Sequence, residues 1–503
     1  MQRIAVIGAG AAGACAVESL ALHMTEPCSL TVLDGGRHLW RGRAYQPDDA
    51  DVLTNIPAAH MSLRADDPGH AARWLDDRAP GALDAHGLTS RALYGAYLAE
   101  TLSRTWRRLA HRGWRLRLVR RPAARLLPEG DGVLVVTADG RRERFDHVVL
   151  CAGPTASPDP YGLAAAAGYR AVPFPLSRTL PAVPADCHVG ILGSGLTAVD
   201  LVAGLATRGH RGPVTLASRS GALPSVNTGC PPPPPRHLTL PQLESLAASA
   251  GARRAADLWD LIRAELRAAG ADHEALRREL DLGEGPAERL RRQLAGGADA
   301  AALAVLRQAL HRFAGQAWNL LPEHEQTALW RRHARAVTSL CCPMPRHRAA
   351  LLLRLLDSGR LRVTGGLAAV APAPHGGFTF TANGTTRLVD VLFNALNPAA
   401  PGACAPGPLE ASVADRWGAG HPLGGLRTDR HTHRVFGADG GHTGIYALGH
   451  ATRGAVLFYF GMPSLVHQSG LVARAVAAGT RAAHGAGGHG AVRSAQRNVE
   501  PGR

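Results

Sequence analysis

The chain has 503 residues and a formal net charge of +16, so it can bury large cores and is expected to form two or three domains. All 56 basic residues are Arg, which excludes Schiff-base and P-loop lysine chemistry. The Arg residues are scattered, and no run of about 18 apolar residues occurs, so neither a nucleic-acid partner nor a membrane span is favoured. A positive field suits anionic cofactors or an acidic substrate.

The eight Cys residues contain no C-x-x-C pair and no metal-ligand spacing. We therefore expect reduced thiols, no metal site and a cytoplasmic protein. The N-terminus is Ala-rich, but its spaced glycines argue against a secretory signal.

A glycine-rich turn follows the first apolar run. Gly8, Gly10 and Gly13 have the G-x-G-x-x-G spacing, which permits a tight turn, close approach to a pyrophosphate and close packing of helix on strand. The next predicted strand, residues 29–33, ends at Asp34, where an acid would accept a hydrogen bond from a ribose hydroxyl. Strand, turn, helix, strand and acid together predict an FAD site.

Two later segments are typical of the rest of an FAD domain. Residues 144–153 resemble the strand and the glycine turn, at Gly153, that close the first half of two-dinucleotide flavoproteins. Residues 444–450 resemble their last FAD strand, but His450 follows Gly449 where many relatives carry Asp. The distance along the chain between Gly8 and Gly449 predicts a discontinuous FAD domain with other modules inserted into it.

A second glycine turn lies near the middle of the chain. Gly193, Gly195 and Ala198 form a G-x-G-x-x-A variant, and the strand that follows ends in Ser218 and Arg219 rather than in an acid. A hydroxyl and a guanidinium suit a 2′-phosphate, which favours NADPH over NADH. In the alternative reading, Arg219 is one more surface Arg of an Arg-rich chain.

These segments predict an α/β protein with two Rossmann-like dinucleotide-binding domains, in which the NADPH domain is inserted into a discontinuous FAD domain. An Ala-, Leu- and Arg-rich stretch at helical spacing adds an α-helical insert on the substrate side. The expected limits are 1–155 and 401–480 for the FAD domain, 156–235 and 361–400 for the NADPH domain, 236–360 for the helical insert, and 481–503 for a disordered tail.

Residues 42–45 and 53–62 are more specific than either glycine turn, since together they read G-x-A-Y and L-x-N-x-P-A-x-x-M-S. This pattern resembles a bacterial family of FAD/NAD(P)-binding proteins related to the flavin-dependent N-hydroxylating monooxygenases. Some members of the wider group resemble aspartate N-monooxygenases of the nitrosuccinate-forming type, from natural-product pathways. The resemblance covers most of residues 1–225 and 385–475.

The resemblance implies the positions of several functional residues. Asn55 and Met61 should lie near the flavin ring, and Arg453 should lie near its edge, as catalytic candidates. The alternative for the first two is a Pro-containing loop that packs on the core. Candidates for contacting the substrate, in part by clamping its carboxylates, are Arg43, Tyr45, Arg64 and Arg91.

The chain lacks the redox Cys pair of disulfide-reducing flavoenzymes, which leaves dioxygen as the favoured electron acceptor. We therefore expect an NADPH-dependent FAD monooxygenase whose flavin C4a-hydroperoxide oxygenates a small substrate, most simply the amine of an amino acid such as L-aspartate. The alternatives are an FAD-dependent oxidoreductase with a non-oxygen acceptor and a non-catalytic dinucleotide-binding protein. A homodimer is left open.

Overall fold

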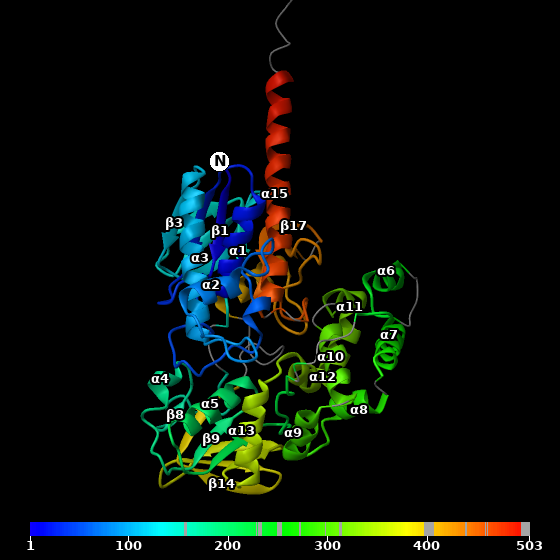
Figure 1. The fold of residues 1–503 in the computed structure, drawn as a ribbon. Helices are drawn as coiled ribbons and strands as arrows, with labels where there is room; N and C mark the ends of the chain where they lie inside the picture. Colours follow the sequence, from blue (N-terminus) through cyan, green and yellow to red (C-terminus); the bar gives the residue numbers. More distant parts are fainter. Residues whose placement is uncertain are drawn as a thin grey trace, which may run out of the picture.

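The structure is a computed structural model with two α/β domains and a helical module that lies beside the second of them (Figure 1). It describes residues 1–493 except 155–157, 228, 230–233, 249–253, 271–272, 297, 311–313, 397–406, 438–439, 458 and 460.

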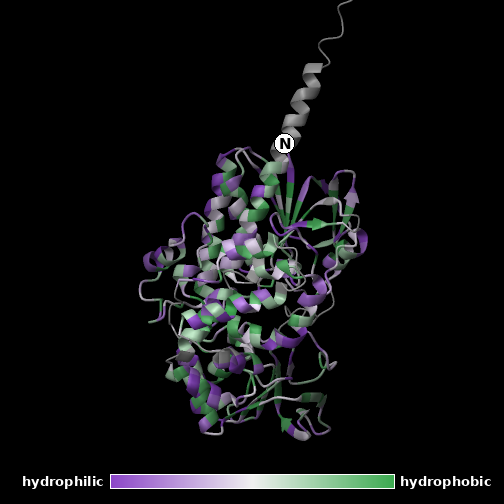
Figure 2. Ribbon diagram, turned by 90° about the vertical axis from the view of Figure 1, so that its right-hand side faces the viewer, coloured by the Kyte–Doolittle hydropathy of each residue, from purple (hydrophilic) through white to green (hydrophobic). Residues whose placement is uncertain are grey.

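The first domain is built on a sheet with the strand order β3-β2-β1-β7-β17-β16. The strands run parallel except β16, which pairs antiparallel with β17. The central strands are continuous apolar runs, as expected where both faces of a parallel sheet are buried (Figure 2). Their bounds are β1 (Arg3–Ile7), β2 (Ser29–Leu33), β3 (Arg115–Val119), β7 (His147–Leu150), β16 (Arg434–Phe436) and β17 (His442–Ala447).

Helices cover one face of this sheet, and a small antiparallel sheet with one helix covers the other. The long α3 begins at a capped N-terminus, where the Ser90 hydroxyl accepts a hydrogen bond from Leu93 N at 3.1 Å. The elements are α1 (Ala11–His23), η1 (Ala58–His60), α2 (His70–Arg78), α3 (Arg91–His111), α15 (Met462–Arg493), β4 (Ala123–Glu129), β5 (Gly132–Thr137), β6 (Arg142–Phe145) and α14 (Pro408–Trp417).

The second domain has a parallel sheet with the strand order β11-β10-β9-β15-β8. Helices α5 and α13 pack with its core, and a second antiparallel sheet, β12-β13-β14, completes the domain. The elements are β8 (Tyr169–Arg170), α4 (Leu176–Thr179), β9 (Val189–Leu192), α5 (Leu196–Thr207), β10 (Val214–Ala217), α13 (Arg346–Asp357), β11 (Leu361–Thr364), β12 (Leu367–Pro372), β13 (Phe378–Ala382), β14 (Thr385–Val389) and β15 (Val391–Asn394).

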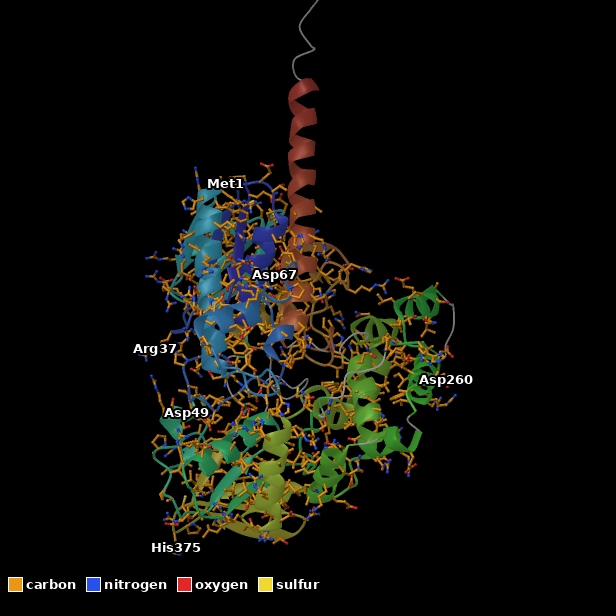
Figure 3. The ribbon with its side chains drawn as sticks, viewed as in Figure 1. Met1, Arg37, Asp49, Asp67, Asp260 and His375 are labelled. Atoms are coloured by element: carbon orange, nitrogen blue, oxygen red, sulfur yellow. The ribbon has the colours of Figure 1, made fainter. Side chains whose placement is uncertain are left out.

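The chain enters the second domain after β7 and returns to the first sheet only at β16 and β17. The second domain is therefore inserted into the first, which confirms the predicted α/β class with two Rossmann-like domains. Direct contacts join the two: Arg208 forms an ion pair with Asp49 at 2.5 Å, and Asp49 lies at the boundary between the domains (Figure 3).

The helical module lies between β10 and α13 and is defined here as α6 to α12 (Figure 1). Helix α13 packs on α5 and leads into β11, which is parallel to β10, so α13 acts as the crossover helix of the second sheet. We propose that the module ends at α12, before the limit at residue 360 that composition predicts. Its helices are α6 (Leu240–Ala248), α7 (Arg254–Ala268), α8 (His273–Asp281), α9 (Pro286–Ala295), α10 (Ala298–Gln308), α11 (Ala314–Leu320) and α12 (Glu323–Cys341).

Helix α15 extends past the sheet that it covers and ends at Arg493 (Figure 1). Residues 481–493 are therefore helical, in contrast to the predicted disordered tail; the high helix propensity of Ala lets the chain continue the helix beyond its packed part. The tail after Arg493 lies outside the described residues. Among the helices described, none combines the length and the hydropathy that a membrane span requires.

Buried histidines predict that the fold loses stability in acid. His433 is 4% exposed, and burial lowers its pKa to about 4 from the 6.5 of an exposed imidazole. The unfolded chain therefore binds a proton below pH 6.5 that the folded chain rejects down to about pH 4. Unfolding free energy should fall across this window by up to about 3 kcal/mol per such histidine.

The measurement is urea unfolding at pH 7.5 and at pH 5. His433→Asn should shrink the difference between the two values, since Asn tolerates the positive φ of 54° found there. His375 is exposed at the far end of the second domain, so His375→Asn is the matched control and should leave the difference unchanged (Figure 3). Equal effects of the two variants would contradict the prediction.

Candidate functional site

The first glycine turn joins β1 to α1, and its three glycines have different surroundings. Gly8 has φ +101°, and a Cβ there would lie 2.8 Å from the carbonyl oxygen of Cys151. A Cβ on Gly13 would overlap the carbonyl oxygen of Gly8, so Gly13 is required for packing. A Cβ on Gly10 would lie 3.5 Å from Gly42 Cα, an ordinary contact. Gly10, the N-cap of α1, is thus the one glycine of this turn that could carry a Cβ without moving its neighbours.

The acid after β2 lies beside this turn. Asp34 Oδ2 accepts a hydrogen bond from Ala9 N at 2.6 Å, and Ala9 O accepts one from Trp40 N at 2.5 Å. Gly153 follows β7, and a Cβ there would have no neighbour within 4 Å. Turn, acid and second glycine loop therefore meet at the carboxyl ends of β1, β2 and β7, the edge at which dinucleotides bind in such sheets.

The segment after β17 closes the same edge. Gly449 is close to α1, since a Cβ on it would lie 3.5 Å from Ala12 Cβ. His450 replaces the expected acid, and burial lowers its pKa to about 4, so the ring is neutral near pH 7. Its Nδ1 has no hydrogen-bond partner in the described part of the chain, and its ring centroid lies 6.1 Å from that of Tyr459. His450 can therefore offer a neutral donor or acceptor where an Asp would offer charge.

Arg453 is 1% exposed and is fixed by Glu410 of α14. Its Nη1 donates to Glu410 Oε2 at 2.6 Å and to His450 O at 3.1 Å. Its Nη2 is buried and finds no partner among the described residues. Glu410 also accepts a hydrogen bond from Gly425 N at 3.1 Å. Sequence reasoning missed Glu410, because nothing local to α14 marks this acid as the partner of a residue that follows β17.

The loop that carries the family signature packs on α3. The ring centroids of Tyr45 and Tyr94 are 4.8 Å apart, and the Tyr94 hydroxyl donates to Met61 O at 2.6 Å. Met61 is 2% exposed and belongs to the core of the first domain, whereas Asn55 is half-buried. The two predicted flavin neighbours thus differ in burial: the Met61 side chain is part of the core, whereas the Asn55 side chain is partly accessible.

The structure does not bring the predicted substrate arginines together. Arg91 forms an ion pair with Asp200 of α5 at 2.8 Å, so it joins the two domains. Arg64 forms an ion pair with the buried Glu18 at 3.0 Å and lines a separate cavity of about 170 Å³ that includes no other predicted site residue. Arg43 is exposed and directly follows Gly42, which touches the first glycine turn. Arg43 is therefore the candidate nearest to that turn.

The second turn has the same form as the first. Gly193 has φ +104°, and a Cβ there would lie 2.8 Å from Ala395 O, while a Cβ on Gly195 would have no neighbour within 4 Å. The Ser218 hydroxyl lies 3.0 Å from Ser194 Oγ and accepts from Gly221 N at 2.9 Å. Arg219 is exposed, and no ion pair of its side chain is present within the described ranges.

The helical module reaches the closing segment of the first domain. Trp318 Nε1 of α11 donates to Gly454 O at 2.6 Å, next to Arg453. At the start of α12, Glu323 accepts two hydrogen bonds from Arg427, at 2.6 and 2.9 Å. The module therefore forms a wall beside the segment that holds His450 and Arg453.

Both turns fit a dinucleotide, because each presents backbone without side chains to the N-terminus of a helix. The described residues contain no group of three or more His, Cys, Asp or Glu that could hold a metal ion. The residues present thus suit FAD at the first turn and a nicotinamide dinucleotide at the second, and their individual contacts remain predictions.

Substitutions at the first turn should separate packing from binding. Gly13→Ala should lower the free energy of unfolding by about 1–3 kcal/mol, because the added methyl overlaps Gly8 O. Gly10→Ala should change it by less than about 0.5 kcal/mol, since Gly10 has φ −85° and room for a Cβ, but should reduce the FAD that copurifies. Chemical unfolding and flavin content measure the two effects. If Gly13→Ala and Gly10→Ala lowered the free energy of unfolding equally, the distinction between a packing glycine and a binding glycine would be refuted.

Comparisons with known proteins agree with this geometry. Residues 5–155 match a family model described as FAD-NAD(P)-binding. No curated protein sequence matches the chain.

Similar solved structures include three amine monooxygenases. Ornithine N-hydroxylase of Kutzneria sp. 744, solved with reduced FAD, NADP+ and L-ornithine, is 14% identical, with 95% of this chain and 99% of that chain covered and a TM-score of 0.56. The FAD-bound cadaverine monooxygenase of Erwinia amylovora is 12% identical over 94% of each chain, with a TM-score of 0.57. L-lysine 6-monooxygenase of Pseudomonas syringae is 17% identical, with 94% of this chain and 99% of that chain covered and a TM-score of 0.54.

The fold of this chain is therefore similar to that of these three enzymes, which agrees with the expected relation at the level of fold alone.

Proposed function

We propose that this chain is an FAD- and NADPH-dependent monooxygenase that oxygenates the amine of a small amino acid. The observation that carries the proposal is the pair of dinucleotide turns in inserted domains, with the closing segment of the first domain walled by a helical module. The similar structures named above act on ornithine, cadaverine and lysine, all of which present an amine.

The proposed division of labour follows from the geometry. FAD, when bound, would supply the acceptor for a hydride from NADPH and the activation of dioxygen. Gly10 and the N-terminus of α1 would bind the FAD pyrophosphate, and Asp34 would hold its ribose. Trp318 and the pair formed by Glu323 and Arg427 would exclude water from the closing segment.

Buried thiols support dioxygen rather than a disulfide as the electron acceptor. Cys341 and Cys342 are the one vicinal pair of the sequence. Burial raises the pKa of Cys341 well above its usual range and raises that of Cys342 to about 12. Thiols rather than thiolates are thus present near pH 7, and thiol–disulfide exchange requires the thiolate.

For the substrate we propose an acidic amino acid, with L-aspartate as the first candidate. Arg43 is exposed beside the first turn and could bind a substrate carboxylate in a bidentate geometry.

The test is product analysis with heavy-isotope dioxygen, NADPH and a panel of L-aspartate, L-glutamate, L-ornithine and L-lysine. A product of aspartate that carries the heavy oxygen on nitrogen is the expected result. If only ornithine or lysine gained heavy oxygen, the proposal of a monooxygenase would stand and the proposal of an acidic substrate would be overturned. NADPH consumption without heavy oxygen in any product would overturn the proposed oxygenation of these amines.

A further inference from the structure

A cavity of about 170 Å³ lies in the first domain between α1, α3 and the segment of residues 63–66. Since one water takes up about 30 Å³ of the liquid, the cavity has room for a small organic molecule rather than for a single ion. The charged residues that line it are Glu18, Arg64, Asp66, Arg108 and Arg112.

The cavity is separate from the first glycine turn. Glu18 and Leu22 line it and follow Gly10 by eight and twelve residues along the chain. A rise of about 1.5 Å per residue along α1 therefore places them roughly 12–18 Å from that turn. Neither glycine turn contributes a residue to the lining. A ligand in this cavity is thus distinct from the FAD and the NADPH of the proposed function.

A buried acid holds two of the guanidinium groups in place. Glu18 is 5% exposed and accepts hydrogen bonds from the Thr105 hydroxyl, from Arg64 Nε at 3.0 Å and from Arg108 Nη2 at 3.4 Å. A guanidinium carries five N–H donors, so both arginines keep donors for a further acceptor. One carboxylate therefore orients two cations without balancing both charges.

The third guanidinium caps the end of α1. Arg112 donates to Ala21 O at 2.7 Å and to Met24 O at 2.5 Å, and it forms no ion pair with any residue that the structure describes. Asp66 is exposed and is the second carboxylate of the lining. Three guanidiniums and two carboxylates thus line the cavity, which gives the lining a net positive charge.

The segment that carries Arg64 is fixed by its own hydrogen bonds. Leu63 N donates to the Tyr97 hydroxyl at 2.9 Å, and Arg64 N donates to Ser62 Oγ at 3.1 Å. The backbone on which the Arg64 side chain stands is therefore ordered before a ligand binds, which reduces the entropy that binding costs.

We propose that this cavity binds a small dicarboxylate such as succinate. Arg108 and Arg112 lie one turn apart at the end of α3, and side chains at this spacing start about 5–6 Å apart, which suits two carboxylates better than one phosphate. One carboxylate binds to Arg64 and Arg108 and the other to Arg112, because guanidiniums bind carboxylates through paired hydrogen bonds.

The first test is calorimetric titration of the purified, FAD-containing protein with succinate, which has no amine to be oxygenated. Arg108→Gln should weaken succinate binding about tenfold or more. The Arg108 side chain is 46% exposed, so this change should cost the fold little. Arg107 is exposed on the same helix and does not line the cavity, so Arg107→Gln is the matched control and should bind succinate as the wild type does.

The second test reverses the sign of the effect. Asp66→Asn removes a negative charge from the lining, so it should tighten succinate binding several-fold. Asp76 is exposed on α2 outside the cavity, and Asp76→Asn makes the same change in net charge without the expected gain in affinity. Tighter binding in Asp66→Asn also cannot result from damage to the fold.

Three results would overturn the inference. They are a wild type that does not bind succinate, equal succinate affinities of Arg108→Gln and Arg107→Gln, and an Asp66→Asn variant that binds succinate no more tightly than the wild type. Inorganic phosphate that binds as tightly as succinate would overturn the assignment to a dicarboxylate. A protein that oxygenates amines and fails these tests would leave the proposed function intact.

Discussion

Replacing Arg219 with Ala is expected to raise the Kd for NADPH about 10- to 100-fold, because the charge-assisted hydrogen bonds of a guanidinium to a 2′-phosphate are lost. The Kd for NADH should stay within about twofold, since NADH carries no such phosphate. Arg219 is exposed after β10 and has no ion pair within the described ranges, so its loss should cost the fold little.

Arg178 provides the control for this prediction, because it is also exposed in the second domain. Arg178→Ala has the same effect on net charge and should leave both dissociation constants unchanged. Titration of each variant with both dinucleotides gives the comparison. If Arg219→Ala weakened the binding of NADPH and of NADH equally, Arg219 would contribute only to the general positive field. An equal effect of Arg178→Ala on the two dissociation constants would show the same.

Glu410→Ala is expected to lower the free energy of unfolding by about 3–5 kcal/mol, because it leaves the Arg453 guanidinium buried without its counter-charge. The two side chains are 2.6 Å apart, and the side chains of Arg453 and Glu410 are 2% and 9% exposed. Replacement of both by apolar residues, as in the Glu410→Leu, Arg453→Met double variant, should recover most of that loss. Urea unfolding measures both values.

The double variant also tests whether Arg453 acts in the reaction. Its fold and its bound FAD should be retained, so a fall in kcat for amine oxygenation would be assigned to the missing guanidinium rather than to unfolding. Wild-type product formation by this stable double variant would contradict a catalytic role and would leave Arg453 as a residue that positions the segment after β17.

The two turns were predictable because their information is local. The glycine spacing, the strand before it and the residue that ends the next strand lie within a few tens of residues, and each fixes a backbone requirement that the structure shows at Gly8 and Gly193. The insertion of one domain into the other followed from the distance between Gly8 and Gly449 along the chain.

Long-range pairing was not predictable from the sequence. In an Arg-rich chain, no local pattern says which arginines meet a carboxylate, and Arg64 and Arg91 proved to pair with Glu18 and Asp200. The contact of Trp318 with the closing segment of the first domain likewise spans 136 positions of the chain. Helix α13 shares the composition of the helical module, so composition could not show that it packs on the second sheet.

The most direct measurement of the central claim is the absorbance spectrum of the purified, FAD-containing protein under anaerobic addition of NADPH, followed by oxygen. The account predicts that NADPH removes the visible flavin absorbance and that oxygen restores it, with oxygenated amine formed when the amino acid is present. Flavin absorbance that persists after NADPH is added would contradict the transfer of electrons between the two sites.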